Sequence, residues 1–87
     1  MSDNEFSVWQ FSTDAMGSIQ ERVREWVSAE EAMKAFMHYT RNVAVKLGFT
    51  ERVIVTDGGD CIVAEWTKAE GYTYPPELVD ATRGTHH

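Results

Sequence analysis

The sequence predicts a small α+β domain in which one long helix lies across one face of an antiparallel sheet. Three observations indicate this class: an aromatic, strand-like segment opens the chain, an amphipathic segment occupies its middle, and two apolar segments around a glycine-rich turn follow. The expected order of elements is ββαββ, with a possible short fifth strand. The 87 residues leave room for one domain. We expect its ordered core over residues 5–76, between polar ends at 1–4 and 77–87.

The first two expected strands flank a polar turn at residues 12–18. The strand at 5–11 is rich in strand-forming apolar residues. These are Phe6, Val8, Trp9 and Phe11. Residues 19–27 fit both a strand period and a helix period. We favour a strand, because an aromatic strand and a turn precede the segment and Ser28 offers a helix start directly after it.

A helix is predicted from Ser28 to Leu47, with Gly48 ending it. Ser28 and Glu31 form a capping box, in which both side chains satisfy free amides of the first turn. One side of the segment is apolar at spacings of three and four residues. This stripe contains Met33, Phe36, Met37, Thr40, Val43, Ala44 and Leu47. Such a stripe requires a sheet to cover.

The second hairpin is predicted around Asp57-Gly58-Gly59-Asp60, between strands at 52–56 and 61–66. A two-residue turn at the glycines sets the register. The expected pairs are Val55 with Ile62, Val53 with Ala64, and Arg52 with Glu65. Residues 72–74 add a short strand, and the two following prolines end its pairing.

Composition excludes several classes of partner. Eight Lys and Arg against 14 Asp and Glu give a net charge of −6, the wrong sign for neutralising phosphates. We therefore expect no nucleic-acid partner and no membrane partner. The lone Cys61 forms no internal disulfide, and no apolar run is long enough to span a bilayer, so a soluble cytoplasmic protein is expected. His86 and His87 resemble the remains of an expression tag.

A single helix covers only one face of the expected sheet, which leaves apolar side chains on the other. The uncovered face is expected to carry Trp9, Phe11, Ile54 and Val63. Burial against a second copy explains such a surface, and terminal segments folded over it are the alternative. We therefore expect a non-enzymatic, self-associating or protein-binding module, with a homodimer as the favoured assembly. An Ile54→Asp variant is expected to be monomeric.

The alternative function is a small-molecule binder or accessory enzyme subunit, with an aromatic cleft near His38, Tyr39 and Cys61. The two carboxylates at 57–60 favour a plain turn over a cation site, because the alternating pattern of a calcium loop is absent. The arginines around Trp26 favour a solvated strand edge over a stacking platform for bases. No strong triad, metal or cofactor pattern occurs, so we predict no catalytic residue, no metal ligand and no cofactor.

Overall fold

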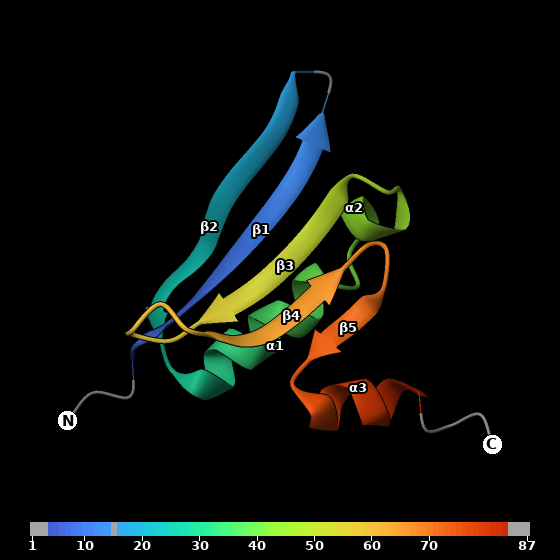
Figure 1. Cartoon of the computed structure of the whole chain (residues 1–87). Helices are drawn as coiled ribbons and strands as arrows, with labels where there is room; N and C mark the ends of the chain where they lie inside the picture. Colours follow the sequence, from blue (N-terminus) through green and yellow to red (C-terminus); the bar gives the residue numbers. More distant parts are fainter. Residues whose placement is uncertain (1–3, 15, 84–87) are drawn as a thin grey trace.

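The computed structural model describes residues 4–14 and 16–83, which form one antiparallel sheet and three helices (Figure 1). The strands are β1 (Phe6–Asp14), β2 (Gly17–Val27), β3 (Thr50–Thr56), β4 (Ile62–Thr67) and β5 (Gly71–Tyr74). The helices are α1 (Ala29–Tyr39), α2 (Val43–Lys46) and α3 (Pro76–Arg83). The sheet order is β2-β1-β3-β4-β5, so β1 lies between β2 and β3. The predicted α+β class and antiparallel sheet are confirmed.

The core lies between α1 and one face of the sheet, which we call the helix face. Helix α1 contacts β1, β2 and β3, and in Figure 1 it passes behind the strands. The side chains that meet here are fully or almost fully buried. They are Val8, Ala32, Ala35, Phe36, Val53, Val55 and Ala64. Burial of this apolar surface is the main term that stabilises the layer.

The segment at residues 19–27 is a strand, as we favoured, and it forms an edge of the sheet as part of β2. Its pairing with β1 is interrupted by register shifts on either side of Val8, which is paired with Arg24. Trp26 follows with a positive φ of 55°. These irregularities end the regular edge before the chain enters α1 through Ser28, whose Oγ accepts a hydrogen bond from the Glu31 backbone N–H at 3.1 Å.

The prediction of one long helix is wrong, because the segment is divided into α1 and the short α2. The Thr40 Oγ1 hydrogen-bonds to the Met37 carbonyl at 3.1 Å and lies 2.7 Å from the Tyr72 hydroxyl. Asn42 then begins a new helix, with its Oδ1 accepting the Val45 N–H at 3.1 Å. A side chain that bonds its own backbone competes with helix continuation, and here a contact from β5 stabilises the break.

The predicted register of β3 and β4 is also wrong. The observed pairs are Val55 with Ala64, Ile54 with Glu65, Val53 with Trp66, and Arg52 with Thr67. The connecting turn is longer than two residues, because the Asp57 Oδ1 accepts hydrogen bonds from the N–H groups of Gly59 and Cys61. Asp60 takes a positive φ of 64° within this turn. Ile62 therefore pairs with Thr56 rather than with Val55.

The polar stretch that we expected as a tail from residue 77 contains α3. This helix begins at Pro76, where a missing N–H costs nothing because the first helical amides have no partner within the helix. Leu78 packs against the core, and α3 contacts β5. The two terminal histidines lie outside the described residues.

Candidate interaction surface

The sheet face opposite α1, which we call the open face, is not covered by any described element. Figure 1 looks onto it, with α1 behind the strands, α2 beside the start of β3 and α3 beyond the end of β5. Side chains alternate along each strand, so the neighbours of the buried Val8, Val53 and Ala64 point to this side. The open face is defined by Trp9, Phe11, Arg22, Arg52, Ile54, Thr56, Glu65 and Thr73.

Trp9 lies in β1 between two strands that both fix its ring. Its Nε1–H donates a hydrogen bond to the Thr56 Oγ1 at 3.1 Å, across to β3. From the other side, the Arg22 guanidinium carbon lies 4.4 Å from the ring centroid, in cation–π contact. Arg22 is held in turn by Glu25, with 2.9 Å between Nη1 and Oε2. The indole is therefore positioned by a side chain on each flanking strand.

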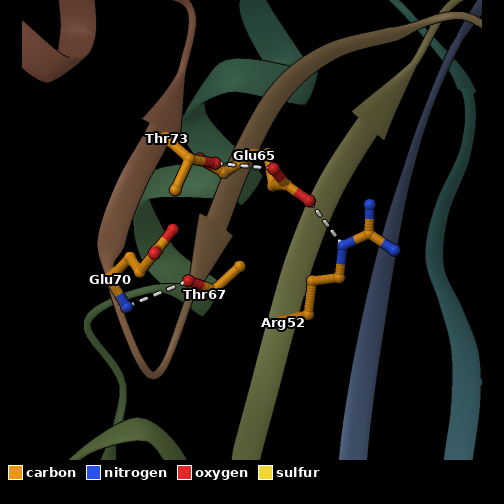
Figure 2. Close-up of polar contacts among 5 residues, drawn as sticks. All are labelled: Arg52, Glu65, Thr67, Glu70 and Thr73. Carbon is orange, nitrogen blue, oxygen red and sulfur yellow. Dashed lines mark hydrogen bonds and ion pairs between the residues drawn. The ribbon is translucent and has the colours of Figure 1, made fainter.

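A second stack lies beside the first, where the Arg52 guanidinium carbon is 5.4 Å from the ring centroid of Phe11. Figure 2 shows how Arg52 continues into a polar row across β3, β4 and β5. The Arg52 Nε–H donates to the Glu65 Oε2 at 2.6 Å, and the Thr73 hydroxyl donates to the Glu65 Oε1 at 2.6 Å. Each carboxylate oxygen of Glu65 thus has its own donor.

The polar row shifts the ionisation of Glu65. The hydrogen bond from Thr73, with the hydrogen bond and positive charge of Arg52, holds the pKa of the Glu65 carboxyl below its usual range, although partial burial acts to raise it. Nearby, the Thr67 Oγ1 accepts the Glu70 backbone N–H at 3.1 Å and closes the turn between β4 and β5 (Figure 2). The lowered pKa favours the charged form of Glu65, which is held on β4 by Arg52 of β3 and Thr73 of β5.

The four predicted interface residues occupy different environments. Trp9 and Phe11 are half-buried on the open face, each under an arginine. Ile54 is paired with Trp9 on one side and Glu65 on the other, and it is only 7% exposed within the single chain. Val63 lies at the register shift of β4 and is half-buried, with contacts to the core. The accessible part of the surface is therefore aromatic rather than aliphatic.

Sequence reasoning placed Arg52 and Glu65 on the uncovered face without counting them as interface residues, and it missed Arg22 and Thr73 as members of this surface. The alternation of Arg22 with its neighbours and the predicted pairing of Arg52 with Glu65 were the available signals. The ion pair does form, but it is diagonal, since Arg52 is paired with Thr67 in the ladder. Prediction of these contacts across three strands requires the observed register of β3 and β4, which the glycine turn alone did not indicate.

The residues of the alternative aromatic cleft are not brought together. His38 is exposed near the end of α1, and its ring meets that of Tyr39 edge-on at 5.0 Å. Arg24 lies over Tyr39 at 5.7 Å. Cys61 is exposed in the turn between β3 and β4, at the end of the molecule where α1 begins (Figure 1). A shallow depression of about 320 Å³ lies instead at the start of α1, lined by Ser28, Glu30, Glu31 and Lys34.

The turn at residues 57–60 uses its first carboxylate internally, because Asp57 caps two backbone N–H groups. Within residues 4–14 and 16–83, no three His, Cys, Asp or Glu side chains gather in a way that could hold a metal ion. Among the same residues, no helix has the length and apolar character needed to cross a bilayer. Comparison of the chain with protein-family models, with curated proteins and with solved structures finds no match.

Proposed function

We propose that this protein is a non-enzymatic binding module that pairs with a second copy of itself through the open face. The observation that carries the proposal is the combination of an uncovered sheet face with two half-buried aromatic rings, Trp9 and Phe11, stacked under arginines. Aromatic residues and arginine are enriched at the centres of protein interfaces, where they contribute most of the binding energy. Both kinds of residue are present on the open face.

The charge distribution favours a second copy as the partner. On the open face, Arg22 is paired with Glu25 and Arg52 with Glu65, so these four charges cancel. The net charge of −6 is therefore carried by the rest of the chain. Two copies repel each other least when they approach through a locally neutral face.

The distribution of donors and carboxylates on the same face supports a two-fold interface, which has to be complementary to itself. Arg52 has five N–H donors, and its bond to Glu65 uses one of them. Figure 2 shows its two terminal nitrogens turned away from that carboxylate. A second copy brings its own Glu25 and Glu65 to the same surface, so donors of one face can meet carboxylates of the other.

The variant Phe11→Glu tests this proposal. A carboxylate at this half-buried position adds a charge to the interface and removes an aromatic contact, so at protein concentrations too low for weak contacts the solution mass is expected to fall from twice the chain mass to the chain mass. Light scattering after size exclusion measures it. Ile19→Glu is the matched control, because Ile19 is paired with Ser12 on the other side of the sheet. A wild-type protein that is monomeric at every concentration would contradict the proposal.

The sequence-based test Ile54→Asp is replaced for a physical reason. Ile54 is 7% exposed without any partner, so an aspartate there is buried within the single chain. Loss of the oligomer in that variant would then follow from unfolding as well as from a broken interface. Phe11 is half-buried and separates the two effects better.

A further inference from the structure

The two ends of the molecule differ in the charged residues that they carry. One end is formed by the start of α1, the end of β2 and the turn between β3 and β4, and the opposite end contains α2 and the start of β3 (Figure 1). The first, which we call the acidic end, contains Glu5, Glu25, Glu30, Glu31, Asp57 and Asp60. The second, which we call the basic end, contains the cations Arg41, Lys46 and Lys68 together with the carboxylates Glu51 and Glu70, of which Glu51 is paired with Lys68.

The basic end exposes three large apolar side chains within seven residues, which we call the patch. Its members Val43, Leu47 and Phe49 are 68%, 62% and 55% exposed. Val43 and Leu47 lie one turn apart, since the Leu47 N–H donates to the Val43 carbonyl at 2.9 Å. Exposed apolar clusters of this kind, flanked by polar groups, mark interaction sites.

Two of the cations around this patch are available to a partner. Arg41 and Lys46 are exposed and form no ion pair with another residue in the described part of the chain. Lys68, by contrast, is held by the Gly48 carbonyl at 3.1 Å and by Glu51 at 3.5 Å. A matching surface therefore has to present an apolar group beside carboxylates.

The acidic end presents such a group in Trp26. Its side chain is 55% exposed, although tryptophan is among the most buried residue types on average. Its backbone has a φ of 55°, a left-handed conformation that a bulky residue rarely adopts. Strained positions of this kind concentrate at functional sites. Glu25 precedes this indole directly, and Glu30 and Glu31 follow in the first turn of α1.

We propose that Trp26 of one copy docks on the patch of Val43, Leu47 and Phe49 of the next copy. In this contact the carboxylates of the acidic end face Arg41 and Lys46; Glu25 and Glu30 also pair with Arg22 and Lys34 of their own chain, whereas Glu31 and Asp60 form no ion pair within the described residues. The two surfaces belong to different ends of the same chain, so the contact is heterologous and leaves a free site at each end of the pair. It involves few residues, which places it in the class of small, weak interfaces.

This head-to-tail contact shares Glu25 with the open face but uses neither of its aromatic rings, and its test is carried out in the Phe11→Glu background. In that background the sheet-face interface is removed, so failure of one proposal is distinguished from failure of the other. Two further variants remove one half of the contact each: Trp26→Gly, where glycine adopts the positive φ freely, and Leu47→Glu, at an exposed position. Amide spectra of each variant check that the fold is kept.

The decisive experiment is sedimentation of the two variants alone and mixed in equal amounts. Each variant alone is expected to be monomeric. The mixture is expected to form a pair of twice the chain mass, because the intact Trp26 of one variant meets the intact patch of the other. Added salt is expected to weaken the pair, since its charges are exposed.

Two results would overturn the proposal. A mixture that stays monomeric at the highest soluble concentration shows that the two ends do not recognise each other. In the second result the mixture again forms no complex, but the Phe11→Glu protein binds phosphatidylserine vesicles and the added Leu47→Glu substitution abolishes this binding. That result would assign the patch to an anionic membrane surface instead.

Discussion

At the scale of single residues, the contacts of Glu65 on the open face make the stability of the fold depend on pH. Its pKa is held below the ordinary value of 4.5 by the Thr73 hydrogen bond and by Arg52. A carboxyl with a lowered pKa in the folded state stabilises the fold when the pH is above its unfolded pKa. That contribution is lost as the pH falls from about 4.5 through the lowered pKa.

The variant Glu65→Gln tests this assignment. At neutral pH the free energy of unfolding is expected to fall by about 1 kcal/mol, because charge-assisted hydrogen bonds at a half-buried site are replaced by weaker ones. Below pH 4 the difference from the wild type is expected to shrink. Urea titrations across this range measure both effects, with the exposed Glu21→Gln as control. A constant difference at every pH would show that Glu65 acts through packing alone.

At the scale of elements, α2 exists because Asn42 begins it. The Asn42 Oδ1 accepts the Val45 N–H at 3.1 Å, and the short helix has only four residues. Neither the alternation of apolar residues nor the capping box at Ser28 indicated this second start, since the apolar stripe runs through it without interruption. The break depends on the Tyr72 hydroxyl next to Thr40, which is a contact distant in sequence.

Removal of this cap in Asn42→Ala is expected to lower the free energy of unfolding by about 1 kcal/mol, the usual cost of losing an N-cap. The amide signals of Val43 to Leu47 are expected to shift most. Arg41→Ala, at the preceding exposed residue, serves as the control with little change in stability. Equal stability of Asn42→Ala and the wild type would mean that packing alone positions α2.

The sequence predicted the strands and the start of α1 better than it predicted the strand register and the two later helices. Both hairpins, the start of α1 and the aromatic face of β1 follow from local pattern, because they depend on neighbouring residues. The register of β3 and β4 could not be predicted, since Asp57 closes the turn with its side chain. The stack of Arg52 on Phe11 required that register and the pairing of β1 with β3. Residues 19–27 fitted both a strand and a helix, and no local signal indicated the positive φ of Trp26.

At the scale of the whole molecule, the domain has two layers, a sheet and a helix layer, and one face of the sheet is not covered by any described element. A domain of this size buries only about 60% of the surface of its unfolded chain, so burial of a further face adds substantially to its stability. The open face is neutral and aromatic, whereas Trp26 and the exposed side chains of Val43, Leu47 and Phe49 lie at the two ends of the molecule. We expect the open face to form the stable contact and the ends to form the weak one.

Intermolecular nuclear Overhauser effects between isotope-labelled and unlabelled copies test the central proposal most directly. The predicted result is a set of contacts from the Trp9 Nε1–H and the Phe11 ring of one copy to open-face residues of its partner. These contacts are expected to disappear in Phe11→Glu and to persist in Ile19→Glu. Intermolecular contacts confined to Trp26 and Leu47, or none at all, would contradict pairing through the sheet.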